Sequence, residues 1–207
     1  MSDRDHGPRP AREGEPGTLA SRVIHDGRIV HLSVDTVRFP DGSTGELEMV
    51  HHAGAAAVLP VVGDPGAADP EVLLIRQYRY AAGGELYEVP AGMPNAPGES
   101  WEEVAARELE EETGWRGRRF RYLTRIYTTP GFTDEVIRLY LATDLEKGTS
   151  RLDRDEFLEV VRVPFSQAVE WVREGRVQDG KSAVTILWTA CFGPWSEPAE
   201  ERAGSGA

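Results

Sequence analysis

Three glutamates fall on one face of a short helix that the sequence predicts after Ser100. Ser100 is a good N-cap and Glu103 completes a capping box, so the spacing predicts a helix that begins at Trp101 and stops at Gly114. At about 100° per residue, an arc of roughly 100° holds all three carboxylates. They are Glu108, Glu111 and Glu112. Because like charges one turn apart destabilise a bare helix, we expect a divalent cation to compensate this face.

Such a face suits the hydrolysis of a phosphoanhydride. Mg²⁺ held by a few carboxylates neutralises charge on the non-bridging oxygens and positions a water molecule. The alternative is a solvated acidic helix face, which is the usual fate of a run of charges. The residues around the helix decide between the two interpretations.

These residues form a longer motif. Gly92 is followed after six residues by Glu99, and Glu99 after seven by the segment Arg107-Glu-Leu-Glu-Glu-Glu-Thr-Gly-Trp115. The motif resembles the box of the Nudix hydrolases, and every fixed residue of that box is present. One departure is visible: the first spacer is one residue longer, which enlarges the loop before the helix. Some members of the ADP-ribose pyrophosphatase branch are similar in this respect.

The resemblance implies a role for each residue of the box. The expected metal ligands are the carboxylates of Glu108, Glu111 and Glu112 and the backbone carbonyl of Ala91. The catalytic group also includes Glu99 and Arg107, whose pairing fixes the loop against the helix. A guanidinium can bridge two carboxylates, so Arg107 can also hold a metal ligand in position. The alternative for Arg107 is an ordinary ion pair with Glu103 or Glu111, worth about 0.3–0.5 kcal/mol.

Three further segments resemble the ADP-ribose pyrophosphatase branch. Pro130 lies sixteen residues after Gly114, the place of a proline that marks this branch, although a plain Pro-Gly turn is the alternative. The other two segments are residues 76–80 and 86–92. We therefore assign Pro130 to the substrate site.

Two charged residues in these segments are candidates for binding substrate. Arg79 is our choice for the diphosphate or terminal ribose, because a guanidinium makes bidentate bonds to phosphate oxygens; a solvated arginine at a strand edge is the alternative. Glu88 is expected to bind ribose hydroxyls or a water near the metal. Phe132, Tyr78 or Tyr80 could stack on adenine, but isolated aromatic residues are more often core.

The attacking water needs a base. The segment 152–160 resembles a late loop that supplies a glutamate in relatives of this branch, and Glu156 is the best candidate there. Asp155 and Glu159 are the alternatives, and all three could instead be solvated carboxylates. A loop position suits a group that closes over substrate and then releases product.

The elements that position these residues alternate between strands and helices. Periodicity and turn residues predict strands near 30–34, 46–52, 55–62, 72–80, 87–90, 120–128, 136–143 and 157–163, with further helices at 166–174 and 182–192. This order fits an α/β fold, a mixed sheet in an α/β/α sandwich, and the resemblance implies the Nudix fold. An N-terminal antiparallel strand extension precedes it.

We expect residues 54–195 to be the hydrolase domain and residues 19–53 the β extension, which the resemblance implies is used for homodimerisation. Residues 1–18 and 196–207 lack periodicity and are expected to be disordered. The net charge of −12 argues against a nucleic-acid partner. A single cysteine, the absence of an apolar h-region and the absence of an apolar span indicate a cytoplasmic protein that does not bind membranes.

The resemblance thus implies a pyrophosphatase that uses Mg²⁺, or Mn²⁺, to cleave ADP-ribose into AMP and ribose 5-phosphate. Another nucleoside diphosphate sugar or an oxidised nucleotide is an alternative substrate. A non-catalytic nucleotide-sensing domain is an alternative from a different class of protein. The complete set of box glutamates and the lack of a basic helix-turn-helix region disfavour the sensor.

Overall fold

The computed structural model describes residues 8–148 and 158–193 of the chain. The chain divides into two compact units. The first comprises Met1–Gly54 with Tyr127–Val136, and the second comprises Ala55–Ile126 with Ile137–Ala207. The first unit therefore includes the segment that carries Pro130, and the second includes the whole predicted box.

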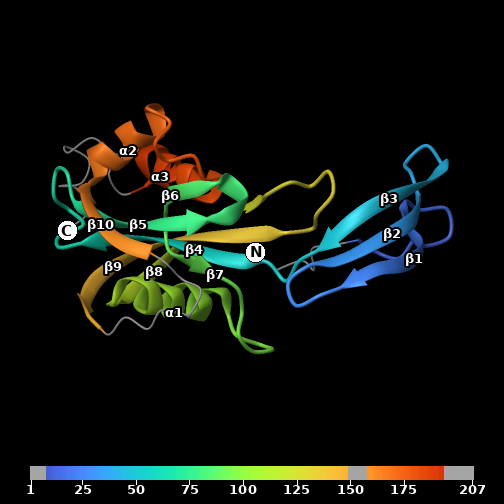
Figure 1. The fold of residues 1–207 in the computed structure, drawn as a ribbon, viewed down its shortest axis with the longest axis horizontal. Helices are drawn as coiled ribbons and strands as arrows, with labels where there is room; N and C mark the ends of the chain where they lie inside the picture. The colour runs from blue at the N-terminus through green and yellow to red at the C-terminus, as the bar shows by residue number, and fades with distance from the viewer. Residues whose placement is uncertain (1–7, 149–157, 194–207) are drawn as a thin grey trace, which may run out of the picture. The chain divides into compact units, whose positions relative to one another are not determined.

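The first unit is built on an antiparallel sheet (Figure 1). Its strands, in spatial order, are β1 (Gly17–Asp26), β2 (His31–Arg38) and β3 (Thr44–His51). The predicted strands near 30–34 and 46–52 correspond to β2 and β3, whereas β1 was not predicted. Register shifts between Thr18 and Ala20 and between Val23 and His25 interrupt the alternation of β1, which explains the missing signal.

The prediction of disorder for residues 1–18 was wrong at its C-terminal end. Gly17 and Thr18 belong to β1. The Ala11 N–H donates to the Thr18 carbonyl at 2.9 Å, and the Thr18 N–H donates to the Arg9 carbonyl at 2.8 Å. Residues 1–7 and 194–207 lie outside the described residues.

The second unit holds a seven-stranded sheet with the order β10-β5-β4-β9-β8, in which β6 pairs with β5 and β7 with β4. The strands are β4 (Ala55–Val62), β5 (Glu71–Arg79), β6 (Gly84–Glu88), β7 (Ala91–Gly92), β8 (Trp115–Tyr127), β9 (Val136–Lys147) and β10 (Leu158–Pro164). The sheet is mixed, because β4 is parallel to β9 and antiparallel to β5.

Helices cover both faces of this sheet, as Figure 1 shows: α1 (Trp101–Thr113) lies on one face, and α2 (Phe165–Arg173) and α3 (Gly180–Phe192) lie on the other. All eight residues of β4 are buried. Alternate residues of β4 face opposite ways: Leu59 packs with the α2 and α3 side chains, and Val58 packs with those of α1. The predicted α/β/α sandwich is confirmed.

The ends of α1 are set by its own sequence, as predicted. The Glu103 N–H donates to Ser100 Oγ at 3.3 Å, and the Ser100 N–H donates to Glu103 Oε2 at 2.8 Å, which completes the capping box. Gly114 ends the helix with φ of 70°, a left-handed conformation that glycine adopts without strain. Among the described helices, none has the length and apolar character needed to cross a membrane.

Candidate active site

Arg107 joins the acidic face of α1 to the loop that precedes the helix. Its Nε donates to Glu99 Oε1 at 3.0 Å, and its Nη2 donates to the Met93 carbonyl at 2.7 Å. Its Nη1 donates to Glu108 Oε1 at 2.6 Å and to Glu111 Oε2 at 3.0 Å. The expected pairing of Glu99 with Arg107 is therefore present. The single guanidinium also holds two of the three carboxylates expected to bind metal.

The charges of this cluster are mutually stabilised. Burial by itself lowers the pKa of Arg107, but the hydrogen bond to Glu99 and the charge of Glu108 raise that pKa above its ordinary value. The hydrogen bond from Arg107, followed by that from the Asn95 N–H, lowers the pKa of Glu99. Both groups thus remain ionised at neutral pH, and the loop stays bound to the helix.

The remaining side of the acidic face lies against β7. The Ala91 N–H donates to Glu112 Oε2 at 3.1 Å, and the Glu112 side chain is almost fully buried. A Cβ added to Gly92 would lie 2.0 Å from Glu108 Oε1. Any larger residue at this position would displace the Glu108 carboxylate, which occupies the space of a side chain.

The side chains at this face offer the oxygen ligands that a hard divalent cation prefers. They are the carboxylates of Glu108, Glu111 and Glu112, with the backbone of Ala91 alongside, and oxygen donors of this type suit Mg²⁺ or Mn²⁺. Within the described residues, no three acidic or imidazole groups are already arranged to hold a metal. A bound cation would compete with Arg107 for the oxygens of Glu108 and Glu111.

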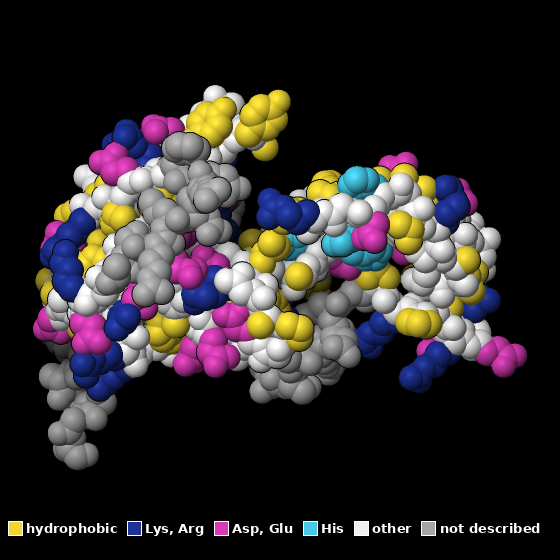
Figure 2. All heavy atoms as spheres, turned by 60° about the horizontal axis from the view of Figure 1, so that its bottom comes forward, with side chains coloured by type: hydrophobic (Ala, Val, Ile, Leu, Met, Phe, Trp, Pro, Cys, Tyr) yellow, Lys and Arg dark blue, Asp and Glu magenta, His cyan; other side chains and the backbone are white. Residues whose placement is uncertain are grey.

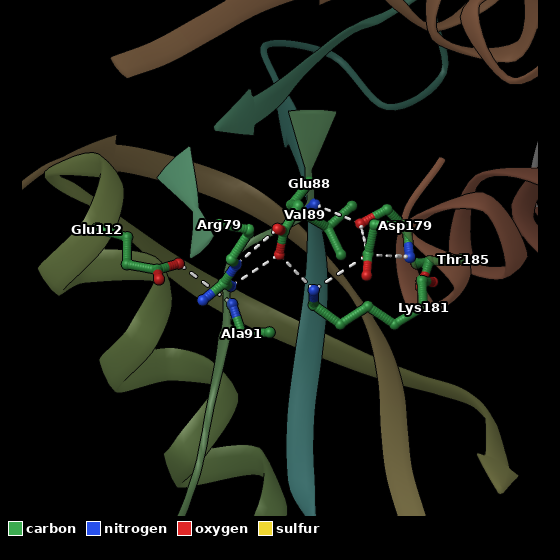
Figure 3. Close-up of polar contacts among 9 residues, drawn as sticks. Arg79, Glu88, Val89, Ala91, Glu112, Asp179, Lys181 and Thr185 are labelled. Atoms are coloured by element: carbon green, nitrogen blue, oxygen red, sulfur yellow. Dashed lines mark hydrogen bonds and ion pairs between the residues drawn. The ribbon is translucent and has the colours of Figure 1, made fainter. Parts of the chain in front are cut away.

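A second charged cluster surrounds Glu88, whose side chain is only 1% exposed (Figure 3). Arg79 binds it bidentately, with Nε to Oε1 at 2.7 Å and Nη2 to Oε2 at 2.8 Å. Lys181 Nζ donates to the same Oε2 at 2.5 Å and to Asp179 Oδ2 at 3.0 Å. Both oxygens of Glu88 thus accept hydrogen bonds from these two cations, and its role in binding ribose or a water near the metal stays a prediction.

The ionisation of this second cluster follows from its contacts. Burial raises the pKa of Glu88, but hydrogen bonds from Arg79 and the charge of Lys181 outweigh burial and lower it. The hydrogen bond to Glu88 raises the pKa of Arg79, and the nearby charge of Glu112 adds to the rise. The two clusters are thus close enough to interact electrostatically, and Figure 3 shows Arg79 beside the contact between Glu112 and Ala91.

The sequence interpretation missed Lys181, Asp179 and Ser182. Asp179 caps α3 by accepting the Ser182 N–H at 3.0 Å, and Ser182 Oγ accepts the Val89 N–H at 2.8 Å. A local signal was present, because a lysine in the first turn of a helix opposes the helix dipole. A residue that opposes the stability of its own helix in this way often belongs to a functional site.

The other predicted residues are not brought into these clusters. Glu156 and Asp155 lie outside the described residues. Glu159 is 62% exposed and pairs with Arg76 at 2.5 Å. Pro130 belongs to the first unit, in an exposed turn where the Phe132 N–H donates to the Thr129 carbonyl at 3.1 Å. The three candidate adenine-stacking aromatics, Tyr78, Tyr80 and Phe132, are 50%, 89% and 53% exposed, so none is a core residue.

The first unit contains a serine, histidine and aspartate in a relay, but this relay is structural. Ser33 Oγ lies 3.0 Å from His51 Nε2, and His51 Nδ1 lies 2.8 Å from Asp134 Oδ2, the order found in serine hydrolases. However, Ser33 is 2% exposed and its hydroxyl donates to Asp35 at 2.8 Å. A substrate cannot reach this hydroxyl, so the relay ties β2 and β3 to the Asp134 segment.

Comparison with known proteins identifies the family. The NUDIX domain profile matches residues 51–184. The chain belongs to the Nudix family. The match includes the complete Nudix box and extends to Lys181, so both charged clusters lie within the Nudix domain.

Two relatives match the chain over the same length. The ADP-ribose pyrophosphatase of Bacillus subtilis (strain 168) is 37% identical over 176 residues, which cover 84% of this Nudix chain and 92% of the relative. The methanol dehydrogenase activator of Bacillus methanolicus is 35% identical over 176 residues, with the same coverage of 84% and 92%. A solved structure of an ADP compounds hydrolase has a TM-score of 0.74 at 21% identity and covers 88% of this chain and 97% of its own. This last likeness shows a shared Nudix fold.

Proposed function

We propose that this Nudix protein is a divalent-metal-dependent pyrophosphatase that hydrolyses ADP-ribose to AMP and ribose 5-phosphate. The observation that carries the proposal is that Arg79 lies beside the contact between Glu112 and the Ala91 N–H (Figure 3). This arrangement supports a single site in which a cation suited to phosphate adjoins an acidic face suited to metal. The similarity to an ADP-ribose pyrophosphatase over 84% of the chain supports this choice of substrate.

Each part of the site would contribute one requirement of the reaction. Glu108, Glu111 and Glu112 would hold Mg²⁺ or Mn²⁺, which supplies charge neutralisation and a water of lowered pKa. Arg79 uses Nε and Nη2 for Glu88, and this leaves Nη1 for a phosphate oxygen. Arg107 holds Glu99 and the loop at the start of the helix, which preserves the orientation of the carboxylates.

A substrate panel tests the proposal. We expect kcat/KM to be highest for ADP-ribose when it is compared with ADP-glucose, GDP-mannose, NADH, diadenosine polyphosphates and 8-oxo-dGTP, each with Mg²⁺, Mn²⁺ or EDTA. EDTA should abolish hydrolysis. A preference for another nucleoside diphosphate sugar or for 8-oxo-dGTP would select that alternative, and nucleotide binding without any turnover would select the sensor.

We further propose that Glu156 is the general base. Glu156→Gln is expected to lower kcat by about 10²- to 10⁴-fold with little change in KM, since a base acts mainly in the transition state. Steady-state kinetics with ADP-ribose provides the measurement. Asp155→Asn and Glu159→Gln are the controls; Glu159 forms an exposed pair with Arg76, so its loss should cost at most about 1 kcal/mol of stability. A larger fall in kcat for either control would reassign the base.

We also propose that residues 19–53 form the interface of a homodimer. Several large apolar side chains of this segment are exposed: Leu19, Val23, Ile24, Ile29, Val30 and Leu47. Figure 2 shows hydrophobic side chains at the surface of this unit. Sedimentation is expected to give twice the chain mass of 22.8 kDa, and Val23→Asp, at a side chain 70% exposed, should shift the protein toward monomer. A wild-type monomer would refute the dimer.

A further inference from the structure

Lys181 occupies a position that local stability does not favour. It is the second residue of α3, where a positive charge opposes the helix dipole, and its side chain is only 11% exposed. Its ammonium lies 2.5 Å from Glu88 Oε2 and 3.0 Å from Asp179 Oδ2. The contact with Asp179 is made to the N-cap of its own helix, whereas the shorter contact with Glu88 is made to a residue outside the helix, so the placement of Lys181 also serves the cluster around Glu88.

The reason lies in the charge balance of the cluster around Glu88. The cluster contains two carboxylates, Glu88 and Asp179, and two cations, Arg79 and Lys181. The formal charges of these four groups sum to zero. Without Lys181, the two carboxylates would exceed the one remaining cation, and Arg79 would carry the whole counter-charge of Glu88.

The two cations of this cluster differ in their access to a ligand. Arg79 has a side chain 41% exposed, whereas Lys181 is 11% exposed and has both carboxylates as hydrogen-bond partners. A ligand can thus reach Arg79, and Lys181 can influence that ligand through Glu88. The start of α3 is fixed by other contacts, since Ser182 Oγ accepts the Val89 N–H at 2.8 Å and Asp179 caps the helix. Removing the charge of Lys181 should therefore leave α3 in place.

We propose that Lys181 is a positioning residue that offsets the charge of Glu88 and Asp179, so that Arg79 keeps an effective positive charge for the diphosphate of the substrate. This inference rests on the proposed function, because it requires an anionic substrate. Lys181 governs substrate affinity and has little effect on the chemical step, since its ammonium contacts Glu88 and Asp179, whereas Arg107 holds two of the three carboxylates expected to bind metal.

The first test removes the charge and keeps the length of the side chain. Lys181→Met is expected to raise KM for ADP-ribose about tenfold at low salt, the order of effect of one uncompensated charge near a binding site, and to leave kcat within about twofold. Lys181→Arg, which keeps the charge, should stay near the wild-type KM. Calorimetric titration of ADP-ribose in EDTA measures the same change as a Kd without hydrolysis.

The second test restores the charge balance. Asp179→Asn in the Lys181→Met background removes the excess negative charge, and asparagine caps a helix as well as aspartate does. The double variant is expected to recover most of the lost affinity. A purely structural role of Lys181 predicts the opposite, because removing a second partner would add to the damage.

Three outcomes would overturn the inference: an unchanged KM and Kd in Lys181→Met, a fall in its kcat as large as the rise in KM, or a double variant no better than the single one. Failure of the proposed function is distinguishable, because it appears in the wild type as hydrolysis of a different member of the substrate panel. The same variants are then compared on that substrate, which also carries a diphosphate or triphosphate.

Discussion

Glu112→Gln is expected to lower kcat for ADP-ribose by about two to three orders of magnitude while the fold persists. Glutamine matches glutamate in size and retains an oxygen that can accept the Ala91 N–H, now bonded to Glu112 at 3.1 Å. The change therefore removes the negative charge that a cation requires and keeps the packing of this nearly buried side chain. Glu111→Gln should reduce kcat in the same direction.

The melting temperature distinguishes a loss of metal binding from a loss of the fold. In EDTA, the melting temperature of Glu112→Gln should equal or exceed that of the wild type, because the substitution relieves repulsion on the acidic face of α1. The Mg²⁺ concentration that gives half-maximal activity should rise. Glu102→Gln is the matched control, since Glu102 is an exposed glutamate in the first turn of the same helix. Near-wild-type kcat in both Glu111→Gln and Glu112→Gln would rule out the assigned metal site.

Gly92→Ala is expected to reduce kcat by at least about a hundredfold with a small change in stability. The new Cβ would lie 2.0 Å from Glu108 Oε1 and 2.3 Å from Glu108 Cδ, so the carboxylate must move. That movement breaks the 2.6 Å bond from Arg107 and displaces a carboxylate expected to bind metal. Because the displaced atoms are the end of a flexible side chain, the substitution should lower kcat much more than it lowers the stability of the fold.

The control for this variant is another glycine of the same unit. A Cβ on Gly84 meets no atom within 4 Å, so Gly84→Ala should retain the wild-type kcat. The melting temperature of Gly92→Ala should fall by a few degrees, about the shift that 1 kcal/mol causes in a domain of this size. A fully active Gly92→Ala would show that Glu108 is free to leave β7 without consequence, which would contradict its assignment.

The sequence by itself determined the parts of the fold that short-range signals encode. The capping box at Ser100 and the glycine at position 114 set both ends of α1, and these ends agree with the structure. The apolar run Ala55–Val62 was predicted as a strand and forms the buried β4. Each of these signals is carried by residues that are adjacent or a few positions apart in sequence, so local energetics decide the outcome.

Some elements escaped prediction because their local signals are weak. The alternation of β1 is interrupted by register shifts, and β7 has only two residues, Ala91 and Gly92. A strand this short has no period of its own. Its existence depends on pairing with Ala56 and Ala57 in β4. These residues are distant in sequence and become neighbours of β7 only when the chain folds.

The arrangement of the site was decided by the tertiary structure. The motif and its resemblance placed Ala91 with the glutamates of α1, and the fold adds a hydrogen bond from the Ala91 N–H to Glu112, 21 residues away in sequence. The place of Glu88 near the box predicts a role in binding ribose or a water near the metal, which stays a prediction; only the fold brings Lys181 from 93 residues away and buries the carboxylate between two cations. The physical reason is that burial and charge pairing depend on which elements the sheet topology makes neighbours, and no local pattern records that information.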